Sequence, residues 1–86
     1  MTHASHPEIV KRLKRAAGHL TKTITMIEEE QPCLEVAQQL QAVTGALLKA
    51  KRVYVQDHIE HCLNETEMSE TALENLVEFK AIAKFL

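Results

Sequence analysis

Three side chains of this 86-residue chain have the types and spacing of metal ligands: Cys33, His58 and Cys62. His58 and Cys62 are four residues apart, so on a helix they lie on the same face. Cys33 precedes His58 by 25 residues, a separation of about 37 Å along one helix. The three side chains therefore cannot meet within one helix. In an antiparallel pair of helices, however, Cys33 of one copy can lie beside His58 and Cys62 of the other.

This set of donor atoms limits the metal. Two thiolates and one imidazole are soft ligands, which favours Cu(I) or Zn(II) over hard cations. Three ligands suit trigonal Cu(I), whereas Zn(II) and Ni(II) take a fourth. The candidates for a fourth ligand are the remaining histidines near the proposed site or in the N-terminal segment: His3, His6 and His61. Tyr54, one turn before His58, and Glu78 are candidates to orient the ligands by hydrogen bonds.

The same residues also fit other interpretations. A lone cysteine at a helix start is often a small buried apolar side chain, and His19 is interpreted as a surface residue. Thiol chemistry is an alternative function, in which Cys33 and Cys62 of opposed chains form a redox switch. A metal-buffering or structural helical protein that binds no DNA is a further alternative. An enzyme is not expected, because no Ser-His-Asp set, catalytic carboxylate pair or phosphate loop is visible.

The chain is predicted to fold as three helices. Ser5 followed by Glu8 predicts a capping box, and apolar residues at three- and four-residue steps predict a first helix that ends near Glu30. The second helix is predicted from Pro32 to about Leu63. A polar connector over 64–68 and an N-cap at Ser69 precede a third amphipathic helix that runs to the end of the chain.

The length of the second helix predicts an assembly. Some 30 residues make a rod of about 45 Å, longer than a compact monomer of this size would shelter. We therefore expect an all-α, single-domain protomer (residues 1–86) whose long helix packs antiparallel against a second copy. The result is a four-helix-bundle dimer, with the third helix available to cover an end of the bundle or to build a higher oligomer.

Composition and charge narrow the function further. Hydrophobic residues are 45% and charged residues 26%, a globular balance without a membrane-spanning run. No signal peptide is evident, so a cytoplasmic protein with free thiols is expected. The net charge is −2, but the cations gather in two short stretches, 11–15 and 49–52. Such clusters are either solvated helix faces or a surface for an anionic partner.

The pattern resembles the CsoR/RcnR family of all-helical bacterial metal sensors. The residues that carry the resemblance are the opening from His6 through Lys14 with Gly18, then Cys33, the stretch 38–43, and the run Asp57-His58-Ile59-Glu60-His61-Cys62. The copper branch has Cys, His and Cys at the positions of Cys33, His58 and Cys62. It also has a glutamate sixteen residues after the last cysteine, which Glu78 matches, and a tyrosine where this chain has Pro32.

The resemblance implies a function. Members form disc-shaped tetramers from two dimers, bind operator DNA without metal and release it when the inducer binds, which derepresses efflux or detoxification genes. It implies DNA contacts on the first helix and late in the second, which here are Arg12, Lys14, Arg15, Lys49 and Arg52. We therefore expect a Cu(I)-responsive repressor.

Other branches of the family define the alternatives. Nickel and cobalt sensors use a further N-terminal histidine, for which His3 and His6 are candidates, and a zinc sensor would need the same fourth ligand. Persulfide sensors keep the two cysteines without the histidine, and formaldehyde sensors carry an acidic residue near its position. The presence of His58 argues against both.

Overall fold

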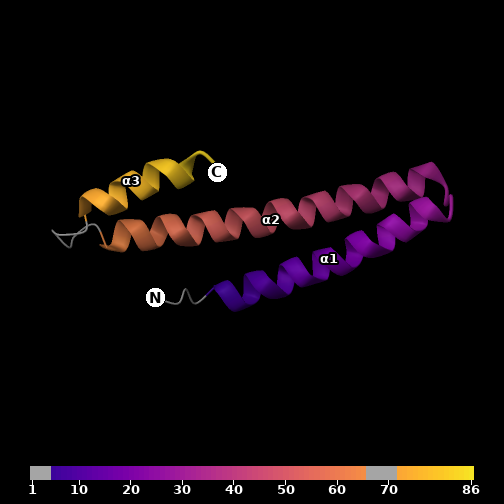
Figure 1. The fold of residues 1–86 in the computed structure, drawn as a ribbon, viewed down its shortest axis with the longest axis horizontal. Coiled ribbons are helices and arrows are strands. Elements are labelled where there is room, and N and C mark those ends of the chain that lie inside the picture. The colour runs from indigo at the N-terminus through magenta and orange to yellow at the C-terminus, as the bar shows by residue number, and fades with distance from the viewer. Residues whose placement is uncertain (1–4, 66–71) are drawn as a thin grey trace.

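The computed structural model describes residues 5–65 and 72–86, except for the side chains of 61–65 and 72. These residues form three helices: α1 (His6–Glu28), α2 (Cys33–Glu65) and α3 (Ala72–Ala83). Helices α1 and α2 form an antiparallel hairpin, and α3 lies along the C-terminal half of α2 (Figure 1). Among the described residues, α3 contacts α2 but not α1. The all-α prediction is confirmed.

The start of α1 differs from the predicted capping box. Ser5 is the N-cap residue, but its side chain makes no capping hydrogen bond, and its buried Oγ has no partner among the described residues. The reason is its backbone, which is helical (φ −80°, ψ −15°) rather than in the extended region that directs a capping oxygen at the N–H groups. Instead, Oε1 of Glu8 lies 3.8 Å from Nε of Arg12, one turn along the helix.

The end of α1 is a tight, hydrogen-bonded reversal. Glu30 has a positive φ of 55°, its N–H donates to the carbonyl of Ile27, and the N–H of Gln31 donates to the carbonyl of Met26, both at 3.0 Å. These two bonds are those of the Schellman motif, in which glycine is the favoured residue at the left-handed position. The chain then enters α2 directly after Pro32, as predicted.

Two predicted helix ends shift in the structure. Helix α2 continues through Glu65, beyond the expected end at Leu63, so the first two residues of the predicted connector are helical. The rest of that connector and the predicted N-cap Ser69 lie outside the described residues. Helix α3 ends at Ala83, because the last residues form turn-type bonds, such as Phe85 N–H to the carbonyl of Ile82 at 2.9 Å.

The core of one chain is narrow. Its described hydrophobic members are mostly small or β-branched: Ile9, Ala16, Val43, Ala50 and Val55. Thr23 is fully buried, and its hydroxyl donates to the carbonyl of His19 at 2.9 Å. Many larger apolar side chains of the predicted stripes stay substantially exposed, among them Leu20, Ile24, Leu40 and Leu47.

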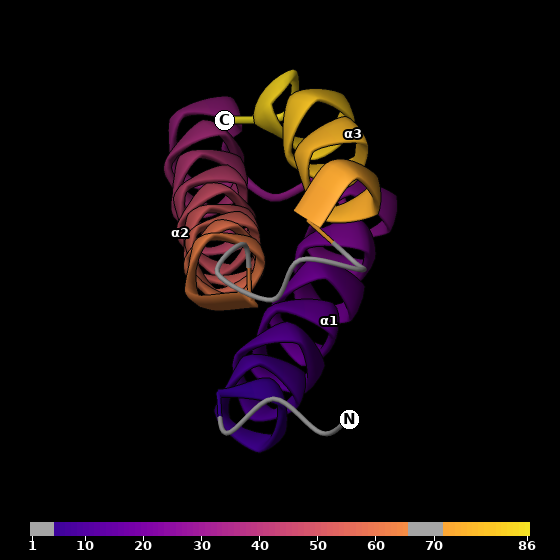
Figure 2. The ribbon, with the colours of Figure 1, turned by 90° about the vertical axis from the view of Figure 1, so that its left-hand side faces the viewer.

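The overall shape is an elongated rod. The chain extends over 58 × 23 × 14 Å with a radius of gyration of 17.7 Å, whereas a compact domain of about 100 residues has about 13 Å. Viewed along α2, the helices leave open flanks instead of a closed bundle (Figure 2). One copy therefore leaves its apolar stripes partly uncovered. No described helix is long and apolar enough to cross a membrane.

Candidate functional site

His58 and Glu78 are brought together by the packing of α3 on α2. Nε2 of His58 lies 2.7 Å from Oε1 of Glu78, twenty residues away in sequence. The His58 side chain is 19% exposed and that of Glu78 55% exposed, so the contact joins a mostly buried ring to a carboxylate that is open to solvent. The sequence predicts both residues near a metal site, and the fold brings their side chains into contact.

This contact decides which ring nitrogen can bind a metal. A carboxylate oxygen accepts hydrogen bonds, so Nε2–H of His58 donates to Glu78 and the neutral ring carries its lone pair on Nδ1. Histidines that ligate metals commonly donate their second nitrogen to a carboxylate in this way, which fixes the ring and raises its basicity. The contact therefore commits Nε2 to Glu78, so that Nδ1 would be the ligating atom if His58 bound a metal.

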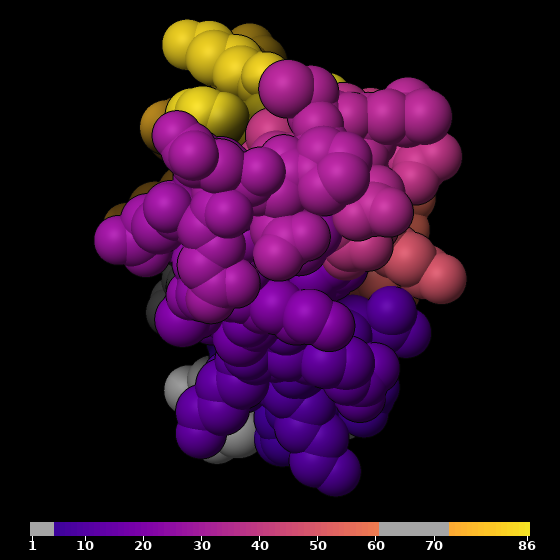
Figure 3. All heavy atoms as spheres, turned by 90° about the vertical axis from the view of Figure 1, so that its right-hand side faces the viewer, coloured from indigo at the N-terminus to yellow at the C-terminus, as the bar shows by residue number. Residues whose placement is uncertain are grey.

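Cys33 lies at the opposite end of α2. It is an exposed free thiol in the hairpin between α1 and α2, beside a largely apolar pocket of about 400 Å³. The lining residues other than Cys33 are Ile27, Glu30, Gln31, Val36, Ala37 and Leu40. Figure 3 views the molecule from this hairpin end, to which the end of α1 and the start of α2 contribute. Because α2 is one continuous helix, Cys33 and His58 of the same chain lie about 37 Å apart.

The other proposed ligands are placed to different degrees. Cys62 and His61 belong to α2; Cys62 lies about one turn after His58, and His61 slightly less. The side chains of both residues, and the whole of His3, lie outside the described part of the chain. Within the side chains that are described, no three His, Cys, Asp or Glu residues gather into a metal site. A site that includes both Cys33 and His58 must therefore combine two chains.

His6 lies close to the same end of α2 as His58. Its ring stacks on Tyr54, with ring centroids 5.4 Å apart and planes 15° from parallel. The two rings border a pocket of about 290 Å³ with Ile9, Val10 and Leu13. Tyr54 is one helical turn before His58, so the stack holds an N-terminal imidazole on the neighbouring turn of α2.

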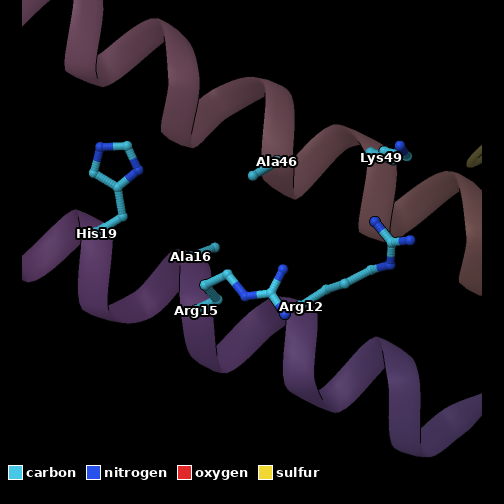
Figure 4. A pocket seen from close by; sticks show the side chains of 6 residues that line it. All are labelled: Arg12, Arg15, Ala16, His19, Ala46 and Lys49. Atoms are coloured by element: carbon cyan, nitrogen blue, oxygen red, sulfur yellow. The ribbon is translucent and has the colours of Figure 1, made fainter.

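Three of the predicted DNA-contacting residues line one pocket. Arg12 and Arg15 from α1 and Lys49 from α2 border a pocket of about 210 Å³, together with Ala16, His19 and Ala46 (Figure 4). The two alanines face each other across the helix pair, and their small side chains leave the space that the cations surround. Lys14 and Arg52 are exposed but do not line this pocket.

His19 lines the basic pocket, a position that the sequence analysis does not predict. It was interpreted as a surface residue, but it is half-buried between the helices and its Nε2 is hydrogen-bonded to Oε1 of Gln39 on α2. The available signal was its position, because His19 lies four and seven residues after Arg15 and Arg12, on the same face of α1.

Comparison with known proteins decides the family. The family model described as "Metal-sensitive transcriptional repressor" matches residues 5–84. The chain belongs to the metal-sensitive transcriptional repressors. The CsoR/RcnR resemblance drawn from the sequence is confirmed, and the family is one of transcriptional regulators, not enzymes.

Named members of this repressor family differ in the metal to which they respond. The copper-sensing transcriptional repressor CsoR of Mycobacterium ulcerans is 35% identical over 72 residues, which cover 80% of this chain and 62% of that protein. This chain thus spans about three fifths of that relative. The copper-sensing repressor CsoR of Bacillus subtilis is 30% identical over 98% of this chain and 90% of that protein. The solved structure of the nickel-responsive transcriptional regulator InrS has a TM-score of 0.82 and 33% identity, covering 100% of this chain and 98% of that one.

Proposed function

We propose that this protein is a cytoplasmic Cu(I)-responsive transcriptional repressor. It binds operator DNA in the metal-free state and releases it on binding Cu(I), which derepresses metal efflux or detoxification genes. The observation that carries the proposal is the His58–Glu78 hydrogen bond, which orients Nδ1 of His58 as a ligand. His58 shares a helix with Cys62 at the four-residue spacing that places both on one face.

The donor set fits the proposed ion. Cys33, His58 and Cys62 supply two thiolates and an imidazole, soft ligands in the number that trigonal Cu(I) takes. Glu78 holds the imidazole from behind, which is the role a carboxylate has beside many metal-bound histidines. Support for copper also comes from the relatives named as copper-sensing.

Two copies are required to complete the site. Cys33 and His58 are about 37 Å apart along α2, so each metal site would combine Cys33 of one protomer with His58 and Cys62 of its partner. The exposed apolar residues of α1 and α2 provide the surface for such a pairing. A dimer with two equivalent sites follows, and α3, with exposed Leu73, Leu76 and Val77, can support pairing of dimers into a tetramer.

The basic pocket supplies the contact to DNA. Arg12, Arg15 and Lys49 concentrate positive charge between α1 and α2 in a chain whose net charge is −2. Ligands from two protomers must come together to bind the ion, so metal binding is linked to the arrangement of the protomers. That arrangement sets the spacing of the basic pockets along DNA, and a change in it weakens the fit to the operator.

The test is an anaerobic titration of fully reduced, metal-free protein bound to its own promoter DNA. Cu(I), Ni(II) and Zn(II) are added in separate titrations, and release of DNA is followed by fluorescence anisotropy. Release by Cu(I) alone, at one ion per protomer, supports the proposal. Release by another metal contradicts the choice of copper, and absence of release by any metal favours a thiol-based switch at Cys33 and Cys62.

A nickel-responsive repressor is the second candidate function. The structural neighbour InrS is named as nickel-responsive, and the stack of His6 on Tyr54 holds an imidazole one helical turn from His58. His6 would then be the fourth ligand that Ni(II), Co(II) or Zn(II) takes. In that case His6→Gln removes the response to Ni(II), whereas a copper sensor with three ligands keeps its response to Cu(I).

A further inference from the structure

The basic pocket concentrates positive charge, and one of the side chains that line it, Arg12, carries an unpaired buried donor. Nε of Arg12 is buried and has no hydrogen-bond partner among the described residues. The carboxylate of Glu8 lies 3.8 Å away, which is too far for a hydrogen bond. With Arg15 and Lys49 bordering the same space, the pocket presents several donors and three cations to whatever enters it. An oxyanion such as a phosphate group has the matching charge and acceptors.

His19 completes the wall of this pocket, and its partner on α2 fixes its tautomer. Oε1 of Gln39 is an amide oxygen that only accepts, so Nε2–H of His19 is the donor and Nδ1 carries the lone pair. Figure 4 shows the Nδ1 edge of the ring on the side of Arg15 and Ala46. Neutral His19 therefore turns an acceptor toward the cations, and protonation converts that edge into a donor.

We propose that this pocket seats one phosphate of the DNA backbone and that protonated His19, held by Gln39, is its fourth phosphate-binding side chain. The inference rests on the proposed DNA-binding function and extends it by adding His19 as a DNA contact and by making DNA binding depend on pH. Operator binding then tightens when His19 carries its proton, so it is stronger at acidic than at alkaline pH.

The groups around His19 determine how strongly its protonation is coupled to the binding of a phosphate. Arg15 on α1 and Lys49 on α2 border the same pocket and are cationic, and Gln39 is neutral. A phosphate in the pocket offsets the repulsion that these cations exert on a protonated ring. Protonation of His19 and binding of the phosphate therefore favour each other, as any two linked binding events do.

The experiment measures DNA affinity of the metal-free protein against salt concentration, at about pH 5.5 and about pH 8. Each phosphate contact adds about 0.9 to the slope of log affinity against log salt. Because His19 adds a side chain to a phosphate that is already contacted, we expect the wild-type slope to be the same at both pH values and the affinity to be about tenfold higher at the lower pH. In His19→Gln, whose amide can still donate to Gln39, this difference in affinity between the two pH values should be lost.

Two further variants keep the test specific. Lys22→Gln removes an exposed cation of α1 outside the pocket, and it should retain the full difference between the two pH values. Gln39→Leu leaves the imidazole but removes the acceptor that fixes its tautomer, so a reduced difference is expected. Circular dichroism at both pH values verifies that each variant is folded.

The outcomes separate this inference from the proposed function. If His19→Gln binds DNA with the same pH-dependent change in affinity as the wild type, the role of His19 is wrong while the repressor proposal stands. If the wild-type protein binds no DNA duplex at low salt at either pH, the proposed function fails, and the phosphate site fails with it.

Discussion

Nε2 of His58 lies 2.7 Å from Oε1 of Glu78, and this bond joins the long helix α2 to the C-terminal helix α3. It is both a tertiary contact and a device that orients a candidate metal ligand. A disturbance at the metal ligand therefore reaches α3 directly. Since α3 also exposes apolar residues suited to contacts between copies, the bond is a physical route by which metal binding can affect quaternary structure.

The first prediction concerns Glu78. Glu78→Ala removes the acceptor that orients His58, and loss of such a partner typically lowers metal affinity by about 10- to 100-fold. Glu78→Gln keeps an acceptor oxygen but removes the charge, so a smaller loss is expected. Competition with a Cu(I) chelator measures both affinities. Glu74→Ala, an exposed glutamate one turn earlier on α3, is the control and should bind as the wild type does. Equal affinity of all three variants would contradict a role for Glu78.

The second prediction separates metal response from DNA binding. Cys33→Ala and His58→Ala remove proposed ligands at opposite ends of α2. Neither residue lines the basic pocket. Both variants should bind operator DNA with unchanged affinity in the metal-free state, and Cu(I) should no longer release it. Anisotropy of labelled DNA measures both properties in one titration. A copper response retained by both variants would show that these residues do not form the sensing site.

The positions of the helices followed from the sequence because apolar periodicity and Pro32 are local signals. The three helices and the distance between Cys33 and His58 could be predicted on this basis, and the family could be predicted from the spacing of Cys33, His58 and Cys62. The inactive cap at Ser5 could not, because it depends on a backbone angle at a single residue. The hydrogen bond between His19 and Gln39 is likewise set by how α1 and α2 face each other, which periodicity fixes only to within a helix face.

The third prediction tests the antiparallel dimer. A pairing that brings Cys33 beside His58 and Cys62 has its centre near residues 46–47, where the two copies of Leu47 approach each other. Leu47 is 42% exposed in one chain. Leu47→Glu would place two carboxylates at this apolar centre, so sedimentation should show a shift toward monomer and Cu(I) affinity should fall, because each site needs both chains.

A matched control is available on the same helix. Gln38 is exposed and lies nine residues from Leu47, which is two and a half helical turns and hence the opposite side of α2. Gln38→Glu introduces the same charge and should leave the oligomer intact. A Leu47→Glu protein that sediments as the wild type does would rule out this register of the dimer.

The fourth prediction concerns the stability of the hairpin. Glu30 has a positive φ of 55° at the end of α1, a conformation that costs a residue with a Cβ about 1 kcal/mol relative to glycine. Glu30→Gly should therefore raise the free energy of unfolding by up to about 1 kcal/mol, and the melting temperature by about 4–8 °C per kcal/mol for a domain of this size.

The neighbouring Glu29 is the matched control, because its φ of −86° is a conformation that any residue adopts. Glu29→Gly should lower the stability, because glycine there only adds freedom to the unfolded chain. Thermal unfolding of the metal-free variants measures both effects. Opposite signs are expected, and equal destabilisation by the two substitutions would show that the left-handed residue at Glu30 is not a source of strain.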